Sequence, residues 1–426
     1  MNNASPKRAI LSVLSHDPDF AGLAGLPSLN TQAGRDVSQW MDQSGLTLPF
    51  LKQLKDYDVT LQIRQEWRHS LSRRQASNAA RTQDLLEEAQ RINEAFRSFH
   101  VTAATLKGFT LVPDFCDDPV LRHQVDFDFL IAPGSVQQAA EALRTCGYFT
   151  AQLNESGETC FLTRSQHIPS ANDDLYALQR QRQVDVHTSI WESCAWFPLE
   201  VPQNCLEHAQ PQKIHGVEQL TLSLADKFLL QVLHLFRHAF RSWIRVSWLL
   251  ELAKCLEKHQ QNEALWNRVI ARAGDARLAN SIFAFVLGLV ARLFHTPIPT
   301  PLAVLTTGAT TLEVRAWLDH FGCDWALSDW PGSLNNLFLT AEFIPDPSLR
   351  MRYWRSRLIP RAAQASMASI EPATPQRFVQ FQAARVRYLA RRAAVHFKDI
   401  AALPQQQLRW KRALESSRRL GIDADF

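Results

Sequence analysis

Two closely spaced aspartates are the residues of this chain that point most directly to chemistry. Residues 125–131 alternate apolar side chains with Asp126 and Asp128, which is the pattern of a strand with one apolar face. Side chains two positions apart on a strand share a face and lie about 6.5–7 Å apart along the backbone. Carboxylates so placed repel each other unless one is protonated or a cation lies between them. The spacing therefore favours a divalent metal site, although a solvated edge strand carries the same pattern without function.

A second strand-like run supplies a third carboxylate. In residues 183–191, Asp185 and His187 alternate with apolar and Thr side chains. If the two strands are neighbours, Asp185 completes an oxygen-rich site for two Mg²⁺ ions, with Mn²⁺ as the alternative ion. Such a pair clamps the attacking and leaving oxygens of a phosphoryl displacement. Mg²⁺ suits the site because it binds few protein carboxylates and completes its coordination with water and phosphate oxygens.

The chain resembles the bacterial uncharacterised nucleotidyltransferase family, which belongs to the DNA-polymerase-β-like nucleotidyltransferase superfamily. The resemblance extends over roughly residues 50–360. Three motifs carry it: Leu106-Lys107-Gly108, Arg122-x-x-x-Asp126-x-Asp128-x-Leu130-Ile131, and Val184-Asp185-Val186-His187.

The resemblance implies that Asp126 and Asp128 hold the metals. It implies that Asp185 is the third metal carboxylate and helps to activate an acceptor hydroxyl. It further implies that Gly108 allows the backbone to approach a triphosphate. The chain departs from the usual superfamily pattern after this glycine, where it has Phe109 instead of Ser or a second Gly, and in a longer insert before Asp126.

Two basic residues near these motifs are candidates for nucleotide binding. Lys107 and Arg122 would steady the phosphate oxygens of an NTP. Arg122 has a second interpretation, in which it pairs with Asp117 or Asp118 and holds the loop in place.

The order of expected elements indicates an α+β fold, with a small mixed-sheet, polymerase-β-like core embedded in a largely α-helical chain. The prediction places a helix over 73–99, strands over 101–106 and 125–131, and a helix over 134–147. A hairpin over 148–153 and 159–163 follows, with residues 164–182 as a loop, and strand 183–191 then closes the sheet. The sheet is mixed because the hairpin interrupts the alternation of strands and helices. We expect no strand after about residue 215.

The helix predicted over residues 220–240 carries two histidines on one face. His234 and His238 have the i, i+4 spacing that can bind a metal. Because neither a third ligand nor an H-E-x-x-H arrangement accompanies them, we expect a structural role or a contact with substrate phosphate, and we group them with His187 as supporting residues. Nearby arginines would supply positive charge to a triphosphate or pair with Asp226 and Glu251; they are Arg237, Arg241 and Arg245.

Composition narrows the function classes. The 426 residues are 46% hydrophobic, enough for two or three domains. Seven cysteines without a C-x-x-C pair favour neither a disulfide framework nor a zinc knuckle and fit a reducing compartment. The first residues lack a signal-peptide pattern, so we expect a cytoplasmic protein. The net charge of +4 is too small to indicate a partner.

Patterning divides the chain into five expected regions. They are an N-terminal appendage (1–45), an N-terminal helical region (46–100), the nucleotidyltransferase-like core (101–215), a helical domain (216–350) and a basic C-terminal helical segment (351–426). The apolar run 278–294 has about the minimum length of a membrane span. Because it contains Asn280, Ser281 and Arg292, we expect a buried helix there and no transmembrane segment.

The last region differs in charge from the rest. Between Arg352 and Arg419 there are fifteen Lys and Arg residues against three acidic ones. Such a basic amphipathic segment could lie on a phosphate backbone or an anionic membrane, or pack its aromatic residues on the domain and leave its arginines solvated. Those that crowd one stretch are Arg377, Arg385, Arg387, Arg391 and Arg392.

Three hypotheses follow. The leading one is a Mg²⁺-dependent nucleotidyltransferase that moves a nucleoside monophosphate from an NTP to an unidentified acceptor (a small molecule, a peptide or RNA) and releases pyrophosphate. The second is a catalytically inactive scaffold that binds a nucleotide or a partner. The third is an RNA-binding protein that acts through the basic C-terminal helices. Fold alone does not choose among them, because function depends on the site.

Overall fold

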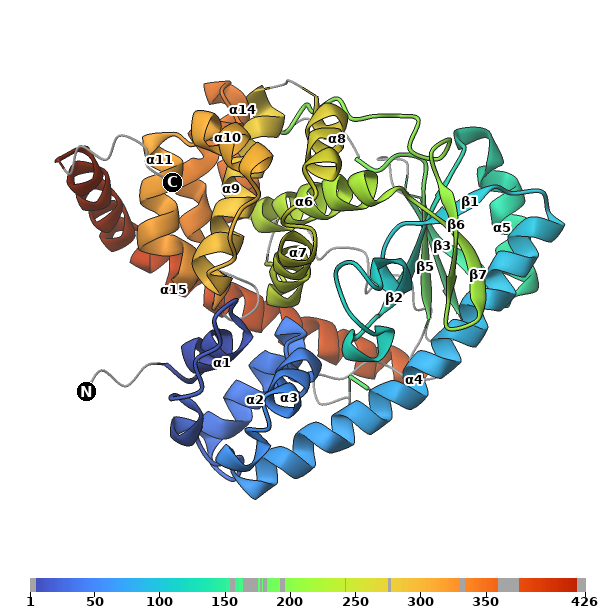
Figure 1. Ribbon diagram of the computed structural model, residues 1–426, viewed down its shortest axis with the longest axis horizontal. Coiled ribbons are helices and arrows are strands. Elements are labelled where there is room, and N and C mark those ends of the chain that lie inside the picture. The colour runs from blue at the N-terminus through green and yellow to red at the C-terminus, as the bar shows by residue number, and fades with distance from the viewer. Residues whose placement is uncertain are drawn as a thin grey trace.

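The computed structural model describes residues 5–153, 158–163, 175–176, 178, 182–191, 196–241, 243–274, 277–328, 334–358 and 375–419. A mixed seven-stranded sheet forms one side of this part of the molecule and helices form the rest (Figure 1). The predicted α+β fold, a small mixed sheet within a largely helical chain, is confirmed.

The strands lie in the order β3-β4-β5-β2-β1-β7-β6. Two neighbouring pairs, β2 with β5 and β1 with β7, are parallel, and the other pairs are antiparallel. The strands are β1 (Ala103–Thr105), β2 (Asp126–Ile131), β3 (Tyr148–Leu153), β4 (Glu158–Thr163), β5 (Gln183–His187), β6 (Gln210–Ile214) and β7 (Val217–Thr221).

Two sequence predictions about the sheet are wrong. Residues 183–191 do not close it, because β5 lies inside the sheet between β4 and β2. A strand also follows residue 215: β6 and β7 form a hairpin through His215-Gly216, both with positive φ, as two-residue hairpin turns require. The hairpin was missed because β6 is largely exposed and polar, and its Pro211 is tolerated only because the strand is at the edge.

In the described chain five helices precede β1 or connect strands of the sheet; the first three share the apolar core of the later helices, and the last two cover one face of the sheet. They are α1 (Pro6–Leu14), α2 (Gln32–Ser44), α3 (Thr47–Asp56), α4 (Gln65–Ser98) and α5 (Val136–Thr145). The predicted helix over 73–99 is confirmed within α4, which begins earlier. Along the sheet, α4 and α5 bury apolar side chains against Phe127, Phe129 and Ile131, and Phe96 meets Phe129 edge to face at a ring distance of 5.1 Å.

The helices after the sheet form a helical part whose apolar core reaches the other face of the sheet. They are α6 (Leu224–Arg241), α7 (Val246–Lys258), α8 (Glu263–Ala273), α9 (Arg277–Phe294), α10 (Thr300–Ala309), α11 (Leu312–Trp317), α12 (Cys323–Ala326), α13 (Thr340–Phe343), α14 (Pro347–Leu358) and α15 (Pro375–Arg419). Leu130 of β2 belongs to their core. Because strand side chains alternate, Asp126 and Asp128 face the same helical side.

The apolar helix α9 lies inside this core. In the described chain, α9 is the helix that is long and apolar enough to cross a membrane, and 72% of this 18-residue helix is buried inside the structure. Its Phe285 packs against Phe236, Trp317 and Phe343. The structure therefore places the 278–294 run as a core helix of the helical domain, as expected.

The long helix α15 runs along the helical part of the molecule (Figure 1). Its C-terminal part docks through Trp410, whose ring stacks on Phe338 at 5.8 Å and interplanar 7°. Val386 and Phe397 are exposed on the same helix. The side chains of the five crowded arginines (377, 385, 387, 391 and 392) and most of the predicted loop 164–182 lie outside the described residues.

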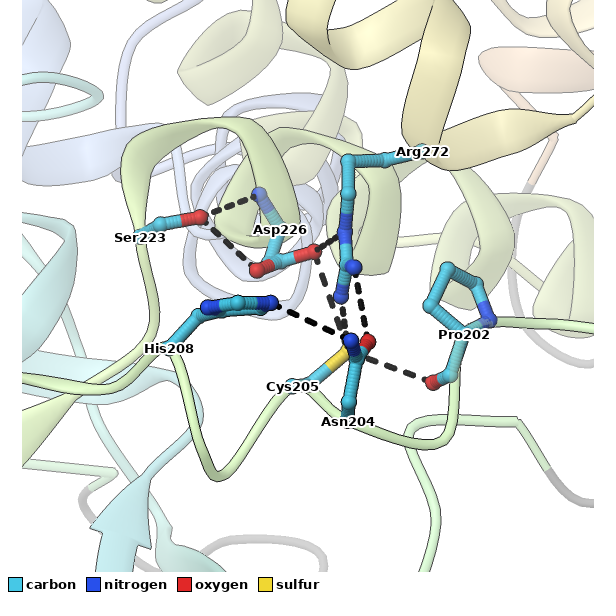
Figure 2. A network of polar contacts seen from close by, with 7 residues as sticks. All are labelled: Pro202, Asn204, Cys205, His208, Ser223, Asp226 and Arg272. Carbon is cyan, nitrogen blue, oxygen red and sulfur yellow. Dashed lines mark hydrogen bonds and ion pairs between the residues drawn. The ribbon is translucent and has the colours of Figure 1, made fainter.

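A buried polar network joins α6 to α8 and to the segment before the β6–β7 hairpin (Figure 2). Asp226, which is 1% exposed, accepts a hydrogen bond from Arg272 Nε at 2.6 Å. Ser223 Oγ donates to the same carboxylate at 2.8 Å, and Arg272 Nη1 donates to Asn204 Oδ1 at 2.7 Å. Figure 2 shows Cys205 beside these groups. The network fixes the start of α6, the helix that faces the aspartates.

Removing the Asp226 carboxylate should therefore destabilise the fold. We expect Asp226→Ala to lower the free energy of unfolding by about 3 kcal/mol, because Arg272 loses its partner in a largely buried network. Denaturant titration followed by circular dichroism measures the change. Asp319→Ala is the matched control, because it removes a carboxylate that pairs with Arg292 but whose side chain is 42% exposed. We expect it to lower the free energy of unfolding by under about 1 kcal/mol. Equal costs for the two variants would contradict the anchoring role.

Candidate functional site

The three predicted aspartates lie together on one face of two parallel strands. In the pairing of β2 with β5, Asp128 is directly opposite Asp185, and Asp126 is opposite Gln183. The expectation that Asp185 comes from a strand next to Asp126 and Asp128 is therefore confirmed. Adjacent strands are about 4.8 Å apart, so two of the carboxylates project from neighbouring backbone positions. Phe127, between Asp126 and Asp128, and its strand partner Val184 are buried on the opposite face.

Asp128 is the most strongly paired of the three. Its Oδ1 lies 3.1 Å from Lys107 Nζ and 3.2 Å from His187 Nε2. Burial alone would raise the pKa of Asp128, but the positive charge of Lys107 and the hydrogen bond from His187 outweigh it and hold the pKa below the usual range. Both Lys107 and His187 thus contact the candidate metal carboxylate.

Asp185 has fewer partners. Gln183 Nε2 donates to its Oδ2 at 2.7 Å, whereas its Oδ1 is buried without a hydrogen-bond partner in the described structure. Burial, followed by the negative charges of Asp128 and Asp126, raises the pKa of Asp185 to about 7. Burial and the charge of Asp128 also raise the pKa of Asp126. The site is therefore short of positive charge for three ionised carboxylates.

This donor set fits a hard divalent cation. Carboxylate oxygens are the ligands that Mg²⁺ takes from proteins, and the buried, unpartnered oxygen of Asp185 is a free ligand atom. Within the described chain, no three His, Cys, Asp or Glu side chains already converge closely enough to hold a metal ion. In this arrangement Lys107 supplies the cationic partner of Asp128.

The turn after β1 brings Lys107 to the aspartates. Leu106 N donates to Asp128 O at 2.9 Å, so the chain leaves β1 beside β2 at this aspartate. Gly108 then has φ +69°, a left-handed conformation that glycine adopts without strain. A Cβ on Gly108 would come within 2.5 Å of the Gln124 amide oxygen. Gln124 is buried, and its Nε2 donates to the backbone oxygen of Asp126 at 2.9 Å.

A buried lysine holds the same turn from the helical side. Lys227 Nζ donates to the backbone oxygen of Thr110 at 2.8 Å and to Gln212 Oε1 at 3.1 Å. Because α6 carries Lys227, the turn is tied to the helix that covers this face of the sheet. Thr110 Oγ1 in turn donates to the backbone oxygen of Lys107 at 3.0 Å. The position of Lys107 is therefore determined by contacts from the sheet and from α6.

Arg122 does not have either of its predicted neighbours as a partner. Its Nε lies 2.8 Å from Glu251 Oε1 on α7; the Glu251 side chain is buried, and that of Arg122 is partly exposed. The alternative pairing with Asp117 or Asp118 is therefore wrong. Glu251 pairs with Arg122, whereas Arg245 donates to the backbone oxygens of Gln43 and His123. Arg122 remains close enough for its charge to lower the pKa of Asp126, against the raising effects of burial and Asp128.

The two helix histidines pack beside the site on α6. Their ring centroids are 4.4 Å apart, and the ring of Trp248 lies 4.6 Å from His234 and 4.9 Å from His238. Burial, followed by the positive charge of Lys107, lowers the pKa of His234 well below its usual value. His234 is therefore neutral and close to Lys107, in keeping with a supporting position.

Four further residues contribute to the site and were not predicted to do so. Gln183 orients Asp185, Gln124 fills the space that Gly108 leaves, Glu251 pairs with Arg122, and Trp248 covers the histidines. Only Gln183 had a sequence signal, because it precedes Asp185 by two residues on one strand. Glu251 and Trp248 come from α7, and no local pattern connects that helix with β2.

Comparison with known families adds one finding. The profile of the family described as "Uncharacterised nucleotidyltransferase" matches residues 33–295, more than half of the 426-residue chain. The match includes the three aspartates, the Lys107-Gly108 turn and both helix histidines. No curated protein and no solved structure matches the chain.

The Gly108 turn generates a prediction. We expect Gly108→Ala to lower the free energy of unfolding by about 2 kcal/mol or more, because it combines left-handed strain with a clash against buried Gln124. Thermal and chemical denaturation measure the loss. Gly147→Ala is the matched control, since Gly147 has φ +85° but open space around its Cβ position, and should cost about 1 kcal/mol. If Gly108→Ala lowers the free energy of unfolding no more than Gly147→Ala does, the Gln124 side chain moves aside without cost and the prediction is wrong.

Proposed function

We propose, from the premise that this chain belongs to the uncharacterised nucleotidyltransferase family, that it transfers a nucleoside monophosphate from an NTP to a hydroxyl group of an acceptor and releases pyrophosphate. One observation carries the proposal: Asp126, Asp128 and Asp185 share one face of two parallel strands, and Asp128 and Asp185 are buried there. Three carboxylates placed together destabilise the fold by mutual repulsion unless a cation neutralises them. A site that uses such a cation explains their arrangement.

Mg²⁺, or Mn²⁺ in its place, would be held by Asp126, Asp128 and Asp185 and would neutralise charge on the triphosphate. The chain's own residues position the reactants. Lys107 and the backbone at Gly108 would bind phosphate oxygens, because Lys107 is the cation already beside the carboxylates. Phosphoryl transfer depends mainly on such positioning and charge stabilisation.

The transfer step is an in-line displacement. The acceptor oxygen attacks the α-phosphorus, the bond from that phosphorus to the bridging oxygen of pyrophosphate breaks, and the hydroxyl proton passes to Asp185. Arg122 acts indirectly, since its guanidinium is engaged by Glu251.

A second candidate is a protein that binds a nucleotide without turning it over. Two observations favour it. Phe109 follows the turn glycine, where the superfamily usually has a small residue. In the described chain, no three His, Cys, Asp or Glu side chains lie close enough together to hold a metal ion. The two candidates share nucleotide binding and differ in pyrophosphate release. They are therefore separated by turnover and not by affinity.

Nucleotide binding is the first test. We expect calorimetric titration with each NTP to give binding in the presence of Mg²⁺ that is lost in EDTA and in the Asp126→Asn, Asp128→Asn double variant, because the metal links the carboxylates to the triphosphate. The Asp319→Asn, Asp324→Asn double variant removes two exposed carboxylates of the helical domain and should bind as wild type does. Unchanged binding in the Asp126, Asp128 variant, or no binding by wild type, would contradict the proposal.

Asp185 separates turnover from binding. We expect Asp185→Asn to retain NTP binding within about tenfold and to lower pyrophosphate release by about 10²-fold or more, because a proton acceptor of this kind contributes about 10²–10⁴-fold. Slow transfer to water, measured with a coupled pyrophosphate assay, serves while the acceptor is unidentified. Pyrophosphate release by Asp185→Asn equal to that of wild type would contradict the role of Asp185, and no release by wild type would favour the non-catalytic candidate.

A further inference from the structure

A large cavity lies between the N-terminal helices and the helical domain. Its volume is about 580 Å³, within the range of about 300–1,000 Å³ that small-molecule sites occupy. Helices α1 and α3 line it on one side, residues 113–123 line it on a second, and α7 lines it on the third. The described lining includes neither Lys107 nor any of the three candidate metal carboxylates, so the cavity is distinct from the proposed nucleotide site.

Positive charge on the described lining of this cavity exceeds what its carboxylates can pair. Two lining cations, Arg245 and Lys258, have no carboxylate partner and bind backbone oxygens instead. Each lining carboxylate, in contrast, already has a basic partner. These pairs are Glu251 with Arg122, Glu257 with Lys254, Asp114 with His259, and Asp56 and Asp117 with Lys52.

One unpaired cation, Arg245, lies at the start of α7 beside a second arginine. Its Nη1 donates to the backbone oxygen of His123 at 3.1 Å, and its Nη2 lies 3.0 Å from the Nδ1 atom of that histidine. Arg122 is the preceding residue, and it also lines the cavity. Burial, followed by the positive charge of Arg122, lowers the pKa of Arg245. Because Glu251 offsets one of these two guanidinium charges, this end of the cavity remains positive.

The first turn of α7 adds hydrogen-bond donors at the same end. The helix has 13 residues and no side chain caps its N-terminus, so the positive end of its dipole lacks a side-chain acceptor. Ser247 is the second residue of α7 and lines the cavity. Its side chain is buried, at 8% exposure, and its hydroxyl has no partner in the described structure. Since buried polar groups are nearly always hydrogen-bonded, this hydroxyl indicates a ligand.

A glycine keeps this end of the cavity open. Gly45 lines the cavity and has φ +72°, a left-handed conformation that glycine adopts without strain. A Cβ on Gly45 would lie 2.5 Å from Ser247 Oγ and 3.1 Å from Arg245 Nε. The hydroxyl and the guanidinium therefore lie next to the same small space, which a larger residue at position 45 would fill.

This set of groups matches a phosphate ester. Glu251 engages Nε of Arg122, and the two Nη groups of that arginine have no partner in the described structure. Guanidinium groups and helix N-termini are the groups with which proteins bind phosphate oxygens. The cavity is much larger than a phosphate ion, and Tyr57 and Trp248 on its lining offer apolar surface to an attached organic group.

We propose that this cavity binds a small phosphorylated molecule, whose phosphate group is held by Arg122, Arg245, the Ser247 hydroxyl and the first N–H groups of α7. The inference goes beyond the proposed transfer reaction and does not depend on it. It requires neither a metal ion nor the three aspartates of the sheet.

The test is a thermal melt of the full chain in EDTA, with increasing inorganic phosphate at an ionic strength held constant with chloride. We expect phosphate to raise the melting temperature by about 1 °C or more, because a ligand of the folded state stabilises it. Glycerol 3-phosphate, ribose 5-phosphate and glucose 6-phosphate are the ester probes. At least one of them should act at a lower concentration than inorganic phosphate, and neutral glycerol, ribose and glucose at that concentration should have no effect.

Ser247→Asp places a carboxylate where the ligand's phosphate would lie. We expect the apparent affinity for phosphate to fall at least about tenfold through like-charge repulsion. In chloride alone, the melting temperature should be at least that of wild type, because the new carboxylate lies beside Arg245 and the helix N-terminus. Ser348→Asp is the matched control: Ser348 is the second residue of α14, is exposed and lies outside the cavity. It should leave the phosphate affinity unchanged.

Glu251→Gln should have the opposite effect on binding. It removes the carboxylate that competes with the ligand for Arg122, so we expect the apparent phosphate affinity to rise about threefold or more. A purely structural pair of Glu251 and Arg122 would give no such gain. The same melts establish that the variant is folded.

The outcomes separate this inference from the proposed function. A phosphate effect that Ser247→Asp removes and that the Asp126→Asn, Asp128→Asn variant keeps supports the inference. Loss of the effect in that double variant places the anion at the aspartates and overturns it, as does an effect that Ser247→Asp leaves unchanged or no effect beyond that of chloride. Phosphate binding that no ester matches overturns the ester class. Phosphate binding together with failed NTP titrations supports this inference and refutes the proposed function.

Discussion

Three carboxylates on one buried face of a sheet repel one another, and much of the surrounding structure compensates for that repulsion. The parallel pairing of β2 with β5 creates the problem, because its register sets Asp128 opposite Asp185. Lys107 and His187 offset part of the charge at Asp128. The remaining imbalance appears as the raised pKa values of Asp126 and Asp185. Groups whose pKa values are perturbed in this way cluster at functional sites.

The helical domain contributes more than a cover for the sheet. Through Lys227, α6 holds the turn that presents Lys107, and through Glu251, α7 holds Arg122. The buried pair of Asp226 and Arg272 in turn fixes the start of α6. The candidate site on β2 and β5 therefore depends on helices that follow β5 by more than thirty residues in the chain. The N-terminal helices complete this arrangement, because they close the far side of the cavity that α7 borders.

Much of the site could be predicted because its signals are local. Alternation of apolar residues with Asp126 and Asp128 determines a strand with both carboxylates on one face, and a second alternating run determines the same for Asp185 and His187. The β6–β7 hairpin was not predictable in this way, because a polar edge strand with a proline lacks the apolar alternation that identifies strands. The partner of Arg122 was equally hidden, since Glu251 is 129 residues away and other carboxylates are nearer in sequence.

By itself the sequence determined which side chains can do chemistry and which of them share a face, because the two-residue period of a strand and the left-handed tolerance of glycine are properties of the local backbone. Tertiary structure alone decided that β5 lies inside the sheet next to β2, that Glu251 and not a neighbouring aspartate binds Arg122, and that α1, α3 and α7 enclose a cavity. These features depend on which surfaces pack together to bury apolar area, and that choice involves residues far apart in the chain.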